Sequence, residues 1–421
     1  MIKVIKKKLI VGLEIGTTKT VVIVGEILDE GIINIIGIGT SNSIGIDRGV
    51  INDLKSIVKS VKQVIHQAEK MANCTISSIY LSLSNKYINC QNEIGIIPIS
   101  KEEITQEDVD YVIHTAKCVK IRNEHKILHV IPQEYSIDQY TGIKNPIGLS
   151  GFRMQAKVHL ITCHTEIKKN IIKAVENCGI KVDYSIFSGI ASGESVLTKE
   201  EKNLGVCIAD IGGGTIDIVI YIDGKLQHSC VIPYAGNTVT NDISYAFNIP
   251  FLNAEQIKIK YGCAVQNTNS TSEEIKIINL DNIIIKTIEQ KKLNEIIEPR
   301  YTELLTLINL EINNTQKKLN NFGNINKLRA GIVLTGGASN IKLLKNCAEK
   351  IFNFPIRIGY PHKININIKD NYNIKQMCYS TATGLLHFGK KYYFSTEKLN
   401  NSSNFFVKCL KHINNWIKKE F

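Results

Sequence analysis

The sequence has no hydrophobic run long enough to cross a bilayer. Its 421 residues include no apolar stretch that reaches the roughly 18 residues a membrane-spanning helix needs. Residues 1–8 lead directly into an apolar, strand-like segment, without the hydrophobic core or cleavage site of a signal peptide. We therefore expect a cytoplasmic protein rather than a secreted or membrane-spanning one.

The sequence also lacks paired cysteines. Its 11 cysteines are scattered, with no Cys-x-x-Cys and no His/Cys pair at the spacing of a zinc motif. This pattern favours a reduced compartment over a disulfide framework. Each cysteine is expected to be a small, buried, apolar residue.

Motifs for nucleic-acid binding are missing as well. The formal net charge is +12, which by itself suits either nucleic acid or an anionic membrane surface. The lysines are spread along the chain, and there is no zinc finger, RNP-type strand or long basic arm. We therefore expect no nucleic acid among the partners.

Length and composition are those of a multi-domain globular protein. Hydrophobic residues make up 43% and charged residues 21% of this 47.1 kDa chain, as is usual for globular proteins. Because single hydrophobic cores stop growing at roughly 250–300 residues, the length predicts two to four domains.

What the sequence does contain is a phosphate-loop pattern written twice. The first copy, at residues 10–24, places Glu14 at the end of an apolar strand, before a Gly-Thr-Thr-Lys turn. The second, at residues 206–221, places Asp210 before a Gly-Gly-Gly-Thr turn. Glycine lets backbone N–H groups approach an anion, threonine adds a hydroxyl donor, and the carboxylate can hold a hydrated Mg²⁺. Two such hairpins facing each other would clamp a nucleotide, and a third glycine turn at residues 331–339 could lie against it.

The elements around the two loops follow the same order. Strands and helices are predicted at residues 9–15, 20–27, 32–39, 53–68 (helix) and 78–83, and again at 204–211, 215–222, 227–232, 239–247 (helix) and 254–261 (helix). This duplication predicts two related α/β lobes with a ligand between them. An insertion with strand-helix-strand-strand order, at residues 85–164, is predicted to form a small domain. Residues 267–282 and 395–404 are polar and are predicted to be a surface loop and a linker.

The three glycine turns, in this order, resemble the nucleotide site of the actin, Hsp70 and sugar-kinase superfamily. Within that superfamily the chain resembles the FtsA family of bacterial cell-division proteins nearly end to end. Segments outside the nucleotide loops carry this resemblance, among them Val130-Ile-Pro-Gln-Glu-Tyr, Arg153-Met-Gln-Ala-Lys-Val-His and Glu298-Pro-Arg-Tyr-Thr-Glu. The chain departs from the family only at residues 267–282 and in the linker.

The resemblance implies an α/β fold. It would be an actin-like, two-lobed, duplicated ribonuclease-H-like fold with an inserted small α/β domain, called 1C, and a C-terminal amphipathic helix. The implied division of the chain is residues 1–84 and 166–204 for the core of lobe 1, 85–165 for 1C, 205–235 and 303–360 for the core of lobe 2, 236–302 for its outer subdomain, 361–391 for a segment closing lobe 1, 392–404 for a linker and 405–421 for the helix.

The resemblance also implies ATP and Mg²⁺ as ligands. Carried over motif by motif, the residues expected at the nucleotide are Gly16, Thr17, Thr18, Lys19, Asp210, Gly212, Gly213, Gly214, Thr215, Gly236, Glu255, Lys258, Gly336, Gly337 and Ala338. Glu14 and Asp210 are expected near Mg²⁺, through water. Lys258 has an alternative interpretation as a solvated helix lysine. Most of the superfamily has Asp where this chain has Glu14, and no catalytic base can be assigned, so we expect slow ATP hydrolysis or none.

The end of the chain, residues 405–421, has the pattern of an amphipathic helix. Its apolar face carries Phe406, Leu410, Ile413, Trp416 and Ile417, and its polar face carries Lys408, Lys411, Lys418 and Lys419. Such a helix usually packs on its own domain. Here the polar linker before it, the lysines and the tryptophan favour an anionic membrane surface, and the FtsA family has a membrane-targeting helix at this place.

Taken with the resemblance, these features imply an ATP-binding, actin-like cell-division protein. It would polymerise, bind the C-terminal tail of the tubulin-like protein FtsZ, tether FtsZ to anionic lipids on the cytoplasmic face of the inner membrane, and recruit later division proteins to the septum. Arg300 and Glu303 are expected at the FtsZ-binding surface, although Arg300 could equally be a surface ion-pair residue. The alternatives are a sugar kinase, a chaperone and, closest, another actin-like membrane-associated filament or pilus-assembly ATPase.

Overall fold

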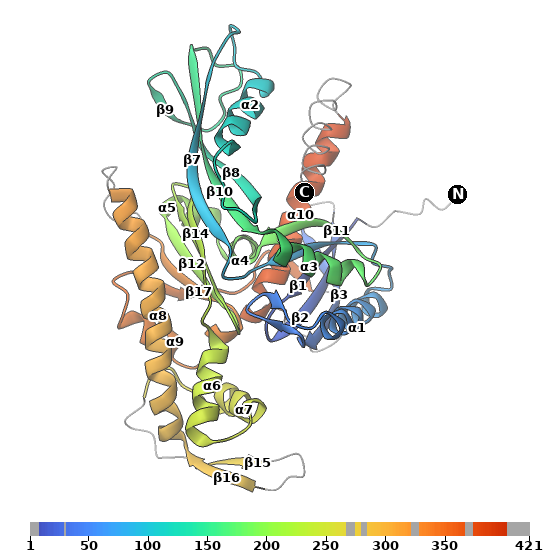
Figure 1. The fold of residues 1–421 in the computed structure, drawn as a ribbon, viewed down its shortest axis with the longest axis vertical. Coiled ribbons are helices and arrows are strands. Elements are labelled where there is room, and N and C mark those ends of the chain that lie inside the picture. The colour runs from blue at the N-terminus through green and yellow to red at the C-terminus, as the bar shows by residue number, and fades with distance from the viewer. Residues whose placement is uncertain are drawn as a thin grey trace.

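The computed structural model describes residues 8–28, 31–266, 274–278, 284–320, 328–366 and 374–401. In this part of the chain two α/β lobes lie side by side, and an elongated domain projects from the region where they meet (Figure 1). The long helix α8 runs along the side of lobe 2 that faces away from lobe 1. The arrangement agrees with the predicted two-lobed α/β fold with an inserted domain.

Lobe 1 is built on a six-stranded sheet in the order β11-β6-β1-β2-β3-β19. β1 is antiparallel to β2 and parallel to β6. Helix α1 begins after Asp53, whose side chain accepts hydrogen bonds from the backbone N–H groups of Lys55 and Ser56, as an N-cap residue should. The elements of lobe 1 are β1 (Leu9–Ile15), β2 (Lys19–Ile27), β3 (Ile33–Asn42), β4 (Ile46–Asp47), β5 (Val50–Ile51), α1 (Leu54–Ala72), β6 (Ser78–Leu83), α3 (Thr165–Glu176), β11 (Lys181–Phe187), α4 (Ser188–Val196), β19 (Ile364–Ile366), η2 (Met377–Tyr379) and α10 (Ser380–Asn401).

Lobe 2 repeats this topology around a five-stranded sheet in the order β14-β13-β12-β17-β18. β12 is antiparallel to β13 and parallel to β17, just as β1 is to β2 and β6. The two loops predicted to bind phosphate are therefore the turns of equivalent hairpins. The elements of lobe 2 are α5 (Lys199–Leu204), β12 (Val206–Ile211), β13 (Ile216–Ile222), β14 (Lys225–Ile232), α6 (Gly236–Phe247), α7 (Phe251–Tyr261), β15 (Glu274–Ile278), β16 (Ile284–Glu289), α8 (Gln290–Asn320), β17 (Gly331–Thr335), η1 (Gly337–Asn340), α9 (Leu344–Glu349) and β18 (Ile356–Ile358).

The inserted domain is a four-stranded sheet, ordered β7-β10-β8-β9, with one helix packed on it. Its elements are β7 (Asn89–Pro98), α2 (Gln106–Lys117), β8 (His125–Ile137), β9 (Tyr140–Ile143) and β10 (Arg153–His164). The ends of β7, β8 and β10 that lie nearer the lobes pack against β14 of lobe 2. The insertion therefore contacts lobe 2 as well as the lobe from which it emerges.

Helix α10 brings the C-terminal part of the chain back to the first lobe, where it packs on α4 and β1. A Cβ atom at Gly384 would lie only 1.8 Å from the carbonyl oxygen of Ala191 in α4, so this close helix contact requires glycine. The contact places the first turn of α10 beside the ends of β1 and β12, between the two hairpins.

The structure departs from the sequence predictions at two places. Within the expected loop 267–282, Glu274–Ile278 forms strand β15. The strand forms because the side chains of Ile275 and Ile277 are part of the hydrophobic core of lobe 2. The expected linker is also shorter than predicted, because helix α10 continues to Asn401. Once a helix is nucleated, it extends readily through good helix formers such as Glu, Lys and Leu. The predicted amphipathic helix 405–421 lies outside the described residues.

Candidate nucleotide cleft

The two predicted phosphate loops face each other across the junction of the lobes. Each turn is closed by the same kind of backbone hydrogen bond, from Gly16 N to Lys19 O (3.0 Å) and from Gly212 N to Thr215 O (2.9 Å). A Cβ atom at Gly214 would lie 2.4 Å from Oγ1 of Thr17, so the loops can approach this closely only because glycine has no side chain. The two hairpins therefore face each other, as the sequence predicts.

A pocket lies between the two loops. The third glycine turn borders it through Gly336 and Gly337. Gly336 has a φ of +92°, a backbone conformation that favours glycine. A Cβ atom there would lie 2.3 Å from Oδ1 of Asp210. The residues that line the pocket include Glu14, Gly16, Thr17, Thr18, Lys19, Asp210, Gly212, Gly213, Gly214, Thr215, Asp217, Gly336, Gly337 and Thr381.

Three buried carboxyl groups lie in this pocket. Burial raises the pKa of Glu14 to about 7, and the charge of Asp210 adds to the effect while Lys19 opposes it. Burial likewise raises the pKa of Asp210, and burial together with the charge of Asp210 raises the pKa of Asp217 well above its usual range. Acidic groups crowded together away from water favour either a proton or a cation. The pocket is therefore a place where a positive charge would be stabilised.

The surroundings of these carboxyls differ. Ser192 and Thr381 donate hydrogen bonds to Oδ2 of Asp210, the second at 3.0 Å, and Ser84 donates one to Asp217. Oε2 of Glu14, in contrast, is buried and has no hydrogen-bond partner among the residues that the structure describes. Because a buried carboxylate oxygen costs free energy unless it is paired, this orphaned atom fits a hydrated Mg²⁺, which prefers oxygen ligands.

Lys19 lies at the edge of the same pocket. Its ammonium group donates to the carbonyl oxygen of Cys378 and lies 4.2 Å from the centre of the Tyr379 ring. Both contacts come from the turn that precedes α10, so the C-terminal part of the chain orients a lysine from the first hairpin.

Some residues that line the pocket or bond to its carboxyl groups were not among the predicted site residues. Asp217 carries a detectable signal, because it pairs directly with Asp210 across β12 and β13 and the two side chains therefore share one face of the sheet. Ser84 is signalled only by its position just after β6. Ser192 and Thr381 carry no signal in the sequence, since they arrive from α4 and α10 through tertiary packing.

The residues expected at the ribose and the adenosine form a second group next to the loops. Lys258 is 5% exposed, and its Nζ donates to the carbonyl oxygen of Gly236 (3.0 Å) and to Oγ1 of Thr240 (2.7 Å). It also forms an ion pair with Glu255 at 2.6 Å. The interpretation of Lys258 as a solvated helix lysine is therefore wrong. A Cβ atom at Gly236 would lie 2.9 Å from that of Ala338, so the third glycine turn contacts this group.

The two residues expected at the FtsZ-binding surface form ion pairs with their neighbours. Nε of Arg300 donates to Asp242 of α6 at 2.5 Å, and its guanidinium group also donates to Glu303. The hydrogen bond and charge of Asp242 raise the pKa of Arg300. The alternative interpretation of Arg300 as an ion-pair residue is therefore realised in the structure, at a side chain that is 30% exposed.

The predicted membrane residues, all between 405 and 421, lie outside the described residues. Among the helices that the structure describes, none is both long enough and apolar enough to cross a membrane.

Comparison with known proteins gives one consistent family. The model of "Cell division protein FtsA" matches residues 207–384, and the model of "SHS2 domain inserted in FTSA" matches residues 85–162. The chain is 73% identical to the cell division protein FtsA of Buchnera aphidicola subsp. Baizongia pistaciae, over 100% of both chains. It is 53% identical to that of Escherichia coli strain K12, again over 100% of both chains.

Solved structures with this fold are more distant in sequence. The PilM–PilN type IV pilus biogenesis complex matches with a TM-score of 0.63 and 15% identity, covering 90% of this chain and 98% of that one. MreB5 of Spiroplasma citri bound to ADP matches with a TM-score of 0.55 and 15% identity, covering 93% of this chain and 98% of that one. At this identity the likeness shows the fold alone, which is that of actin-like proteins.

Proposed function

The chain belongs to the FtsA family of cell-division proteins, and we propose that it binds ATP with Mg²⁺, polymerises, and tethers FtsZ to the membrane at the division septum. In this proposal it is a peripheral protein on the cytoplasmic face of the inner membrane, and later division proteins are recruited to its filaments. The observation that carries the nucleotide part is the group of buried carboxyls between two facing glycine turns.

Each part of the cleft has a role in this proposal. The backbone N–H groups and threonine hydroxyls of the two loops would hold the phosphates. Glu14 and Asp210 would hold the water shell of Mg²⁺, which when bound supplies positive charge between the carboxylates and the phosphates. Glu255 and Lys258 would meet the ribose, and the third glycine turn, Gly336 to Ala338, would lie against the adenosine.

Hydrolysis is proposed to be slow or absent. A catalytic base must be deprotonated at the working pH. The pKa of Glu14, about 7, leaves this carboxyl about half protonated near neutral pH before a cation binds, and burial raises the pKa of Asp217 well above its usual range. Glu14 is also one methylene longer than the Asp found at this position in most of the superfamily, and a displacement of about a bond length disturbs a positioned water.

The C-terminal segment is proposed to be the membrane anchor. Burial of its large apolar residues in the interface would contribute on the order of 5–10 kcal/mol before ordering costs, at ~25 cal/mol per Å². Lys408, Lys411, Lys418 and Lys419 would each add about 1 kcal/mol near an anionic surface. One such helix binds reversibly, so a filament that presents many tails would hold the membrane far more firmly.

The outer subdomain of lobe 2 is proposed to bind the FtsZ tail. Helices α6 and α7 expose apolar side chains there, with Tyr245 91%, Leu252 73% and Ile259 69% exposed. Asp242, which holds Arg300, lies one helical turn before Tyr245 in α6. A peptide with acidic and apolar residues would find both kinds of contact here, with its carboxylates exchanging for Glu303 on the guanidinium group of Arg300.

Co-sedimentation with lipid vesicles tests the proposal as a whole. With ATP, the full-length protein should pellet with vesicles containing anionic lipid and retain FtsZ there, but not FtsZ that lacks its C-terminal tail. Trp416→Glu places a charge on the apolar face and should release the protein from the vesicles without changing its affinity for ATP. If this variant pellets as well as the wild type, the tail is not the anchor. If the wild type pellets but tail-less FtsZ is retained equally, the proposed contact is wrong.

A further inference from the structure

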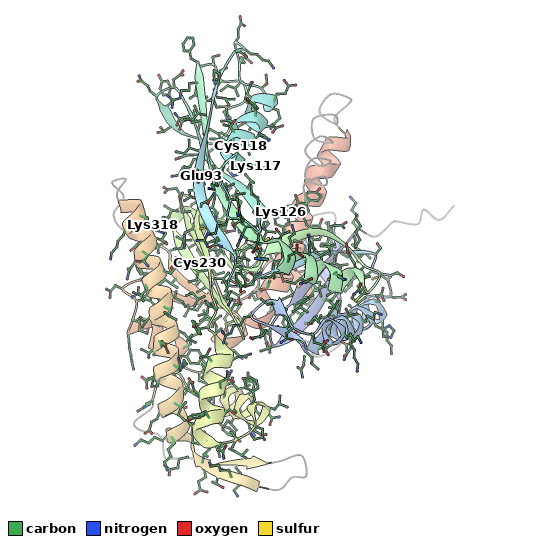
Figure 2. All side chains as sticks on the ribbon, viewed as in Figure 1. Glu93, Lys117, Cys118, Lys126, Cys230 and Lys318 are labelled. Atoms are coloured by element: carbon green, nitrogen blue, oxygen red, sulfur yellow. The ribbon has the colours of Figure 1, made fainter. Side chains whose placement is uncertain are left out.

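A group of metal-ligating side chains lies outside the nucleotide cleft, where the inserted domain meets lobe 2. His228 and Cys230 lie on β14, Glu311 on α8, and Cys90 on β7 of the insertion. One nitrogen of His228, the sulfur of Cys230 and a carboxylate oxygen of Glu311 lie within 4.8 Å of one another. Figure 2 shows Cys230 between α8 and the lower end of β7, well away from Cys118 in the upper part of the insertion.

Backbone geometry explains how these residues converge. His228 and Cys230 are two residues apart in a strand, so their side chains share one face. Cys90 lies at the end of β7 that packs on β14, and its Sγ is 3.6 Å from Nδ1 of His228. Nε2 of His228 is 2.7 Å from Oε1 of Glu311. The strand spacing brings two ligands together, and tertiary packing adds the other two.

We propose that Cys90, His228 and Cys230 bind a zinc-class divalent cation and that Glu311 orients the ring of His228. Tetrahedral zinc with Zn–S of about 2.3 Å and Zn–N of about 2.1 Å holds its sulfur and nitrogen ligands about 3.6 Å apart, which is the separation of Cys90 Sγ and His228 Nδ1. If Nδ1 binds the metal, Nε2–H donates to Glu311, the carboxylate–histidine–zinc arrangement that fixes the ring of a ligating histidine.

His159, on β10, is not among the proposed ligands. Both of its ring nitrogens are engaged, Nε2 with Ser229 at 2.9 Å and Nδ1 with Asn92 at 2.7 Å.

Access and position also suit a metal. The side chains of His228 and Glu311 are 13% and 30% exposed, so an ion can reach the group from solvent. The bound metal would link three parts of the fold: the insertion through Cys90, the sheet of lobe 2 through β14, and the long helix α8. Polar contacts already hold this junction, among them Asn92 Nδ2 to Gln227 O (3.0 Å) and Gln133 Nε2 to Leu226 O (2.6 Å). A metal would add a stronger tie between the insertion and lobe 2.

The chain also contains a matched control. Sγ of Cys118 lies 3.7 Å from Nδ1 of His114 on helix α2, almost the same separation as in the proposed site. This exposed pair shares the cysteine–histidine contact, but its histidine, unlike His228, belongs to no group of three or more metal-ligating residues among those that the structure describes. Any effect that depends only on a cysteine beside a histidine should therefore appear at Cys118 too.

Cobalt and zinc titration of the reduced, chelator-treated, full-length protein tests the proposal. Added Co²⁺ should produce a sulfur-to-cobalt charge-transfer absorption that saturates at one equivalent of Co²⁺, and Zn²⁺ should abolish this absorption. In competition with a chromogenic chelator, Glu311→Gln should weaken zinc binding about 10–100-fold, and Cys230→Ser by more than that. Cys118→Ser should bind like the wild type. The absence of charge-transfer absorption, or an equal loss in Cys118→Ser and Cys230→Ser, overturns the proposal.

A second measurement needs no variant. The wild-type protein is alkylated with iodoacetamide, with and without one equivalent of Zn²⁺, and the modified peptides are quantified by mass spectrometry. Zinc should slow alkylation of Cys90 and Cys230 at least tenfold and leave Cys118 unchanged. Equal alkylation of Cys90 with and without zinc contradicts the site, even if a variant of it fails to fold.

Discussion

Replacing Glu14 with glutamine should make the empty protein more stable, and increasingly so as the pH rises. The carboxyl of Glu14 is buried in the cleft, and its pKa in the folded protein is about 7 instead of the usual 4.5. Glutamine has the shape of the protonated acid but cannot ionise. The variant therefore removes the cost of the buried charge while leaving the packing of the first phosphate loop in place.

The sign and size of the effect follow from proton binding. Between pH 4.5 and about 7, the folded protein keeps a proton on Glu14 that the unfolded chain has released, so stability falls as the pH rises through this window. Each pKa unit corresponds to about 1.4 kcal/mol. The difference between 4.5 and about 7 is therefore worth up to about 3 kcal/mol, fully expressed above the folded-state pKa.

Urea unfolding of the nucleotide-free protein in EDTA checks this prediction. Near pH 5 the Glu14→Gln protein should be more stable than the wild type by less than about 1 kcal/mol, and near pH 8 by about 2–3 kcal/mol. Glu102→Gln, at an exposed position of the insertion, should follow the wild type at both values. A stability difference for Glu14→Gln that is the same near pH 5 and near pH 8 would refute a buried, proton-holding carboxyl. The same variant should bind Mg²⁺-ATP more weakly, as shown by calorimetry.

Further predictions concern the adenosine side of the cleft and the FtsZ surface. Gly337→Asp should abolish ATP binding without unfolding the protein, because the residue lines the pocket and a Cβ atom there meets no atom closer than 3.6 Å; a titration showing wild-type affinity would refute its role. Lys258→Met should weaken ATP binding at least tenfold and lower the free energy of unfolding by roughly 2–3 kcal/mol, because it leaves Glu255 without its cation. Unchanged ATP affinity, titrated at a temperature where both proteins are folded, would exclude a ribose contact. Arg300→Glu should weaken binding of an FtsZ tail peptide about tenfold in an anisotropy assay. Asp242→Asn keeps the Arg300 cation and removes its partner, so it should preserve or strengthen binding; equal losses in both variants would place the peptide elsewhere.

Much of the fold could be predicted because its signals are local. β1 and β6 have the predicted bounds, Leu9–Ile15 and Ser78–Leu83, since a run of branched apolar residues between turn residues is a strong strand signal. Helix α1 begins at Leu54, one residue after its predicted start. Prediction failed where tertiary contacts overrode local composition. β15 lies in a polar segment and forms because two isoleucines reach the core of lobe 2.

The site divides in the same way. The glycine turns and the acids before them were visible in the sequence, because a phosphate-binding turn is built from consecutive residues. The hydrogen-bond partners of these acids were not visible in the sequence, since Ser192 and Thr381 reach Asp210 from sequence separations of 18 and 171 residues. The same holds for the group at Cys90 and His228, which lie 138 residues apart.

The sequence by itself therefore determined the duplicated hairpins, the order of the elements, the family and the amphipathic pattern of the tail, because each depends on residues close together along the chain or on motifs of fixed spacing. Only the tertiary structure decided that Lys258 is buried, that Arg300 is paired with Asp242 and that the acids of the cleft hold raised pKa values. It also decided that His228, Cys230 and Glu311 meet in lobe 2, with Cys90 of the insertion against His228. Burial and charge act through space, and the distances through which they act are set by how distant segments pack.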